Sequence, residues 1–310
     1  MGRTIAFALA LLWSFPAAAA AQEPPVIRVD VRLVRLLVTV KDFDGKLVGS
    51  LNREDFTIFD NDVRQEVAVF DRTTAQPLSV SVLIDTSGSI AKDLKQAVAS
   101  VKRFLSALLR DGNPADEVKL FSFNYEVQEH TGYTRNIAQI EKRLTPLKAE
   151  AGTSLYDAIW FAARSLEKRD GRHVIVVVTD GGNTTSYRSY HEALEAAHRA
   201  DAPIYSLLLM PITNDAGRNI GGENALTTLA MSTGGRMFAP TVGPELDQAL
   251  SEILRDLRTQ YLIGYYPRNL PRTRERYHRV RVELMRPELR ASTRSGYYGD
   301  ADSSNIPEPK

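Results

Sequence analysis

The chain has 310 residues, of which 43% are apolar and 25% charged, a composition typical of a globular protein with a sizeable core. Its 39 basic and 38 acidic residues nearly balance, so no global field favours nucleic acid or an anionic membrane. It has no cysteine, which excludes disulfide staples, zinc–thiolate sites, thiol redox chemistry and a lipid anchor on an N-terminal cysteine.

Residues 1–21 have the pattern of a secretory signal peptide. Arg3 precedes an apolar run from Ile5 to Phe15, and an alanine-rich stretch with an Ala-x-Ala cleavage signal ends at Ala21. A retained membrane anchor is the alternative, but the uncharged stretch is barely long enough to span a bilayer. We therefore expect cleavage after Ala21 and a periplasmic or extracellular location. An exported chain without cysteine favours a bacterial envelope.

Residues 22–76 are expected to form an N-terminal β segment. Apolar residues recur at mostly even spacing between Val29 and Lys41, and shorter strand patterns cover Phe56–Phe59 and Gln65–Phe70. Turn signals separate these runs, and the stretch from Arg72 to Pro77 has the composition of a linker.

Residues 77–260 alternate between strand and helix patterns. Apolar strands at 78–85 and 173–180 are separated by helical patterns, such as the one at 91–110, where apolar residues recur every three or four positions. This alternation predicts an α/β domain with a doubly wound, mostly parallel sheet flanked by helices on both faces.

The β pattern returns in residues 261–299, with strands expected at 261–266, 277–284 and 289–298. Three strands alone make a poor core, so this C-terminal β segment is expected to pack with the N-terminal one as a β-sandwich, with the α/β domain inserted between them. The alternative is that each β segment forms a small sheet of its own, packed against the α/β domain. Residues 300–310 are polar and are expected to form a disordered tail.

Oxygen-bearing side chains follow two of the buried strands. Asp85, Ser87 and Ser89 form an Asp-x-Ser-x-Ser loop, Asp180 ends a second strand, and Thr153 precedes a helix. Ligands bind beyond the carboxyl ends of strands in open parallel sheets. Two carboxylates and three hydroxyls suit Mg²⁺, with Mn²⁺ or Ca²⁺ possible, and the carboxylates would repel each other without a cation. A free position on such an ion would attract a carboxylate of a partner.

Two resemblances follow from these residues. The first is to the von Willebrand factor type A domain and its metal-ion-dependent adhesion site, over about residues 77–260. This resemblance implies that the metal-site positions are Asp85, Ser87, Ser89, Thr153 and Asp180. All five positions are intact. The resemblance rests on Asp85-Thr86-Ser87-Gly88-Ser89, Thr153 and Thr179-Asp180-Gly181. The second, narrower one is to exported bacterial proteins related to this domain, a group without an assigned activity; it rests on Leu51–Phe56, Gly264–Pro267 and Arg294–Tyr298.

The function expected is that of an exported, non-enzymatic, metal-dependent protein-binding module for adhesion or assembly, whose partner presents Asp or Glu. It would bind no nucleic acid and have no membrane span after cleavage. A metal-dependent hydrolase is one alternative, although no convincing general base accompanies the loops. The other is an envelope scaffold in which the ion only ties loops together.

Two weaker signals are set aside. His191, Glu195 and His198 share a helix face and could form a zinc trio, but a solvated surface is the simpler interpretation. The arginine-rich segment 268–294 could offer a basic face to an acidic envelope polymer, although its arginines at 279 and 281 alternate with valines expected to be buried.

Overall fold

The computed structural model describes residues 33–72, 76–209, 220–271 and 276–299. The expected signal peptide, the stretch 22–32 and the expected tail 300–310 lie outside the described residues. Chain contacts place all the described residues in one compact unit. Among the helices of the described ranges, none has the length and hydropathy needed to cross a membrane.

A six-stranded mixed sheet forms the centre of the α/β part. Four neighbouring pairs are parallel and the edge strand β7 is antiparallel, which confirms the doubly wound arrangement. In spatial order the strands are β10 (Met237–Phe238), β9 (Ile204–Leu208), β8 (Arg172–Thr179), β5 (Leu78–Asp85), β6 (Glu117–Phe123) and β7 (Val127–Glu129).

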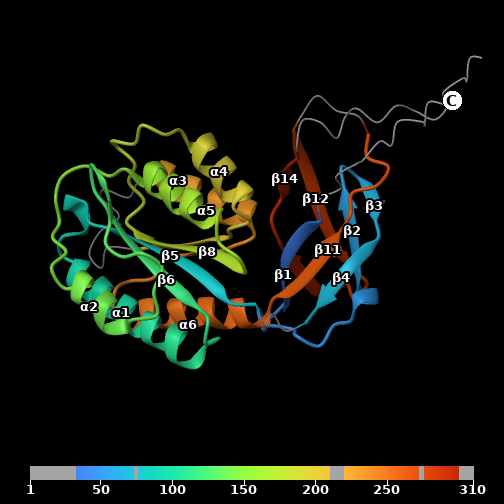
Figure 1. Cartoon of the computed structure of the whole chain (residues 1–310), viewed down its shortest axis with the longest axis horizontal. Helices are drawn as coiled ribbons and strands as arrows, with labels where there is room; N and C mark the ends of the chain where they lie inside the picture. The colour runs from blue at the N-terminus through green and yellow to red at the C-terminus, as the bar shows by residue number, and fades with distance from the viewer. Residues whose placement is uncertain (1–32, 73–75, 210–219, 272–275, 300–310) are drawn as a thin grey trace, which may run out of the picture. The chain divides into compact units, whose positions relative to one another are not determined.

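Helices cover both faces of this sheet, as Figure 1 shows. Val174, Val176 and Val178 of β8 pack toward one group of helices, whereas Ile175 and Val177 pack toward the other. The first group is α1 (Leu94–Asp111), α2 (Ile137–Leu144) and α6 (Pro244–Thr259), and the second is α3 (Leu155–Leu166), α4 (Tyr190–Arg199) and α5 (Ile220–Thr233). Because both faces are covered, every residue of β5 and β8 is buried.

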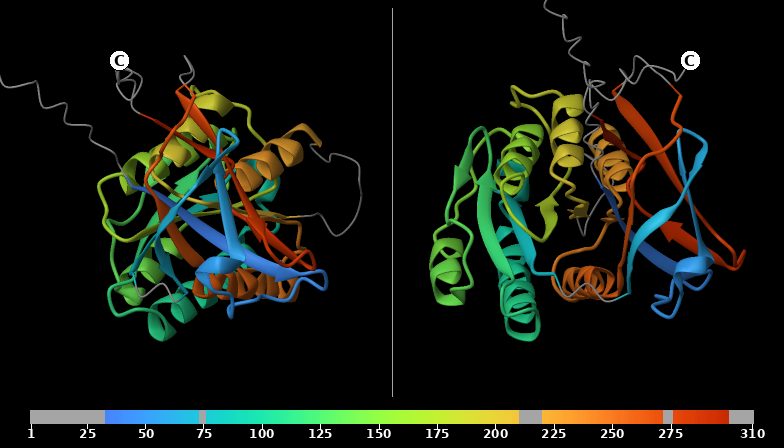
Figure 2. Two further views of the ribbon diagram at one scale, coloured as in Figure 1. Left: turned by 90° about the vertical axis from the view of Figure 1, so that its right-hand side faces the viewer. Right: turned by 45° about the vertical axis from the view of Figure 1, so that its right-hand side comes forward.

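The remaining strands form two antiparallel sheets, each built from both β segments of the sequence. Blue N-terminal strands lie beside orange-to-red C-terminal strands in Figure 2. One sheet has the order β13 (Leu289–Ser292), β1 (Val34–Asp42), β11 (Tyr261–Tyr265) and β4 (Val67–Asp71), and the other β14 (Gly296–Tyr298), β12 (Tyr277–Leu284), β2 (Phe56–Asp60) and β3 (Val63–Gln65). The two sheets share one apolar core, which confirms the sandwich.

The strand expected at 289–298 is wrong as a single element. It is interrupted at residues 293–295, and its two halves pair in different sheets, β13 with β1 and β14 with β12. The break has a physical cause: Arg294 is buried and its Nη2 donates to the carbonyl of Arg35, while the N–H of Ser295 donates to the carbonyl of Ser232 on α5. These bonds replace the ladder that a continuous strand would need.

A buried carboxylate links four strands of the sandwich. Asp60 on β2 is fully buried and accepts hydrogen bonds from the hydroxyls of Tyr265 on β11 (2.9 Å) and Tyr297 on β14 (2.8 Å), and His278 Nδ1 on β12 lies 3.3 Å away. Burial, together with the charge of Asp60, raises the pKa of both phenols well above the usual range. The Gly-Tyr-Tyr patterns of the C-terminal segment therefore meet at one polar centre.

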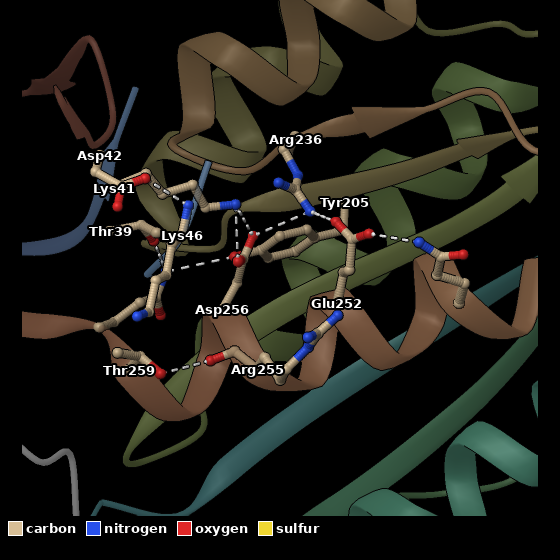
Figure 3. A network of polar contacts seen from close by, with 12 residues as sticks. Thr39, Lys41, Asp42, Lys46, Tyr205, Arg236, Glu252, Arg255, Asp256 and Thr259 are labelled. Atoms are coloured by element: carbon tan, nitrogen blue, oxygen red, sulfur yellow. Dashed lines mark hydrogen bonds and ion pairs between the residues drawn. The ribbon is translucent and has the colours of Figure 1, made fainter. Parts of the chain in front are cut away.

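The helix α6 is tied to the sandwich where it continues into β11 (Figure 3). Asp256 on α6 lies 3.0 Å from Lys41 Nζ on β1 and 3.6 Å from Arg236 Nη2 beside β10. Gln260, the residue between α6 and β11, is fully buried and donates to Thr39 Oγ1 at 3.2 Å. These contacts fix the end of the helix against β1.

Candidate metal centre

The predicted oxygen ligands converge at one edge of the α/β sheet. β5 lies between β8 and β6 in the sheet. The chain passes from β5 to β6 on one side and later returns to β8 on the other, so the carboxyl end of β5 lies where the strand order reverses. Asp85 ends β5, and the neighbouring strand β8 ends at Thr179, directly before Asp180. The Thr179 hydroxyl donates to Asp85 Oδ2 at 2.6 Å. The two carboxylate-bearing strand ends are therefore adjacent, as the sequence predicted.

Asp85 is a fully buried carboxylate held in one orientation. Its Oδ1 accepts the N–H of Ser87 at 2.7 Å, and Thr179 binds the other oxygen. Burial raises the pKa of Asp85 to about 6; the hydrogen bonds from Thr179 and Ser87 oppose this rise, and the negative charge of Asp180 adds to it. No cationic side chain of the described residues is among these influences. A desolvated carboxylate beside a second one is the electrostatic setting that a bound cation would relieve.

The two serines of the loop lie together at its turn. Gly88–Ile90 form a single 3-10 turn directly after Ser87. The hydroxyl oxygens of Ser87 and Ser89 are 3.1 Å apart, with Ser87 buried and Ser89 exposed. The loop thus offers two hydroxyls, one of them facing solvent.

Thr153 and Asp180 lie on either side of a glycine. A Cβ placed on Gly182 would lie 3.4 Å from Thr153 Oγ1 and 3.7 Å from Asp180 Oδ1. Because residue 182 is a glycine, it places no side chain in the space beside these two oxygens. Gly152, which precedes Thr153, has φ +83°, a conformation that favours glycine and sets the direction of this loop.

Backbone hydrogen bonds join the loops of the site to one another. The N–H of Glu150 donates to Thr86 O (2.8 Å), and the N–H of Thr184 donates to Thr153 O (2.8 Å). The N–H of Ser154 also reaches the β6–β7 turn, where it donates to the carbonyl of Asn124. The loops that carry the candidate ligands are therefore held together, because displacing one loop breaks bonds to the others.

Two supporting residues were not assigned a role from the sequence. Thr179 was quoted only as part of the motif, but its hydroxyl orients Asp85. Asp157, in the first turn of α3, is buried and accepts the N–H groups of Tyr187 (2.9 Å) and Arg188 (2.7 Å), which fixes the loop after Asp180. The sequence signal that could have identified Asp157 is its position, since it is an acidic residue four positions after Thr153 in the first turn of a helix.

The donor set fits a hard divalent cation. Carboxylate and hydroxyl oxygens are the ligands of Mg²⁺, Mn²⁺ and Ca²⁺, and two carboxylates would balance the charge of one such ion. For zinc, no group of three or more His, Cys, Asp or Glu side chains that could hold a metal occurs in the part of the chain that the structure describes. The solvated surface expected for His191, Glu195 and His198 does not hold for His198 on α4, which is buried and has its ring centroid 5.5 Å from that of Tyr277.

Comparison with known proteins adds a partial family match. Residues 80–183, which include Asp85, Thr153 and Asp180, match the model of the von Willebrand factor type A domain. The inter-alpha-trypsin inhibitor heavy chain H4 of Bos taurus is 27% identical over 127 residues, covering 37% of this chain and only 14% of that protein.

Two solved structures resemble this fold at low sequence identity. The vWF domain of the type V pili tip protein Mfa5 from Porphyromonas gingivalis is 15% identical, covering 59% of this chain and 95% of that one, with a TM-score of 0.49. The PilB minor pilin from Streptococcus sanguinis is 14% identical, covering 59% of this chain and 62% of that one, with a TM-score of 0.45.

Proposed function

We propose that this chain is an exported, non-enzymatic, divalent-metal-dependent protein-binding module for adhesion or assembly. Asp85, Ser87, Ser89, Thr153 and Asp180 would hold a Mg²⁺-type ion, which would accept an Asp or Glu side chain of a partner protein. The observation that carries the proposal is the buried Asp85 carboxylate, whose pKa is raised to about 6 while Asp180 lies nearby and the Thr179 hydroxyl and Ser87 N–H hold it in place.

The division of the donors between buried and exposed positions suits the capture of an outside group. Asp85, Ser87 and Thr153 are buried, whereas Ser89 is exposed and Asp180 is half-buried, so solvent reaches the site from one side. Three of the five donors are neutral hydroxyls, so a bound divalent ion would keep residual positive charge toward that side. The ion would supply the electrostatic attraction, and the chain's own loops would keep the approach open for a carboxylate.

Export is proposed from the pattern of residues 1–21 and location in a bacterial envelope from the cysteine-free composition. The family match to residues 80–183 supports the binding-module proposal for the α/β part. The sandwich would hold that part by the contacts of α6 and β11 with β1.

Metal binding is tested first, by calorimetric titration of Mg²⁺ and Mn²⁺ into the chain without its signal peptide after exhaustive chelation. Saturable binding is expected in the unmodified chain, strong loss in Asp85→Ala and Asp180→Ala, and no change in the control Asp111→Ala, an exposed residue at the far end of α1. Equal binding by all four proteins would overturn the assignment of the site.

Carboxylate capture is tested on the Mn²⁺-loaded protein by water-proton relaxation. A capped peptide containing one aspartate should lower the relaxation enhancement by replacing metal-bound water, and its asparagine counterpart should not. If removing the metal lowers the stability of the protein but the aspartate peptide does not change the relaxation enhancement, the ion only holds the loops together and does not bind a partner carboxylate. Hydrolysis of p-nitrophenyl phosphate or acetate that Asp85→Ala abolishes would instead support the metal-dependent hydrolase.

A further inference from the structure

A small cavity lies away from the candidate metal centre, between elements that are distant in sequence. Its volume is about 30 Å³, and it is lined by buried and half-buried residues of β1, β8, α4 and the interruption between β13 and β14. We call it the seam cavity and define it by Arg35, Arg172, His198, Asp201, Thr293 and Arg294. A water molecule needs roughly 10–15 Å³ of such space, so one small ion or about two waters would fit.

Several polar atoms of the lining are buried without a hydrogen-bond partner, including both ring nitrogens of His198. Arg294 is nine-tenths buried; its Nη1 binds Asp201 and its Nη2 donates to the carbonyl of Arg35 at 2.9 Å, but its Nε has no hydrogen-bond partner. Thr293 Oγ1 also has none. Leaving a buried donor unpaired costs about 1–3 kcal/mol, and more for a charged group. Thr293 and Arg294 are consecutive residues of the lining, and an acceptor in the cavity would satisfy both unpaired donors.

The charges of the lining favour an anion as that acceptor. Arg35, Arg172 and Arg294 bring three guanidinium groups, of which Arg172 and Arg294 are buried. Asp201 pairs with Arg294 and, at 3.5 Å, with Arg35, while Asp116 acts on Arg172 from outside the lining. Because the side chains of Arg35 and Asp201 are 40% and 36% exposed, solvent screens them, and the field in the cavity comes mainly from the buried Arg172 and Arg294. An anion accepts a stronger hydrogen bond from a guanidinium group than water does.

His198 is affected by the positive charge of Arg294. It is buried in the lining, and burial, followed by the charge of Arg294, lowers its pKa to about 4; Asp201 and a backbone contact with Gly296 oppose this shift. The imidazole is therefore uncharged at neutral pH and adds no charge to the cavity.

We propose that the seam cavity binds a small monovalent inorganic anion of the size of chloride, held by Arg294 Nε and Thr293 Oγ1. Because Thr293 and Arg294 interrupt the last strand, the anion would stabilise this break against the neighbouring residues of β8 and α4. Its occupancy would then add to the stability of the folded chain.

The solution test measures the thermal unfolding midpoint in chloride or bromide against gluconate, which is too large for the cavity, at equal ionic strength. A saturable rise with halide is expected in the unmodified chain, and loss of that rise in Thr293→Val, which keeps the side-chain shape. Thr228→Val on the exposed surface of α5 is the matched control and should keep the full response. A halide response that Thr293→Val leaves unchanged would refute the site, because it would reflect a general salt effect.

The direct test uses anomalous diffraction from crystals grown in sodium bromide. A bromide peak beside Arg294 Nε is expected in the unmodified chain and should be absent in crystals of Thr293→Val. Ordered water at that position in bromide-grown crystals of the unmodified chain would overturn the proposal. An unfolding midpoint that does not depend on halide would overturn it as well.

Discussion

The substitution Asp85→Asn tests the electrostatic reasoning behind the metal centre. The pKa of Asp85 rises from 3.8 to about 6, and each pKa unit corresponds to about 1.4 kcal/mol, so the ionised carboxylate costs the folded protein roughly 3 kcal/mol when no cation is bound. Asparagine removes that charge at nearly constant volume. It cannot accept the Thr179 hydrogen bond through its amide nitrogen, which costs about 1 kcal/mol. We therefore expect a net stabilisation of roughly 2 kcal/mol in chelator at neutral pH.

The pH dependence follows from the sign of this shift. A carboxyl group whose pKa is higher in the folded state binds its proton more tightly there, so protonation stabilises the wild-type protein at low pH. This contribution is lost as the pH rises from about 4 through about 6. The advantage of Asp85→Asn should therefore be absent below about pH 4 and complete above about pH 6. Divalent cations should reverse the order, since only the wild-type chain would gain stability from them.

Urea unfolding at several pH values, in chelator and in Mg²⁺, measures all of these differences. Asp111→Asn, at the exposed end of α1, is the control and should change little under any condition. If Asp85→Asn is less stable than the wild-type chain in chelator at about pH 7.5, burial does not raise the pKa of Asp85 as argued, and the case for a cation at this site loses its main support.

Three further substitutions test the architecture by urea unfolding. Tyr265→Phe removes one hydrogen bond to the buried Asp60 and should lower the free energy of unfolding by about 1–3 kcal/mol; no loss would mean that this bond adds nothing to the sandwich. Lys41→Met leaves Asp256 with only its longer contact and should cost about 1–3 kcal/mol, less in high salt, whereas a salt-independent cost would indicate lost packing. Gly152→Ala places a side chain at a positive-φ position, with its Cβ 2.8 Å from the Cβ of Tyr125. The substitution should lower the free energy of unfolding by more than about 1 kcal/mol and weaken Mg²⁺ binding measured by calorimetry. Unchanged affinity would show that this loop does not position a ligand.

The order of elements and the grouping of the candidate ligands were predictable from the sequence. Helix and strand periodicity are local properties, and the expected strand at 173–180 and helical pattern at 91–110 agree closely with β8 and α1. Asp85 and Asp180 could be placed together because each directly follows an apolar strand, and parallel strands end at the same edge. The type of metal chemistry proposed also follows from the sequence, since it depends on oxygen side chains and on the absence of cysteine.

Other features depend on residues that only the folded chain brings together. Asp60 and Tyr297 are 237 positions apart, and nothing in the local pattern of either indicates that they share a hydrogen bond. The break in the last strand arises from contacts of Arg294 with β1 and of the following serine with α5, and the burial of His198 arises from packing on the aromatic rings of β12 and β14. Sequence periodicity determines which face of an element is apolar, but long-range packing decides which polar groups become buried and what they must bind.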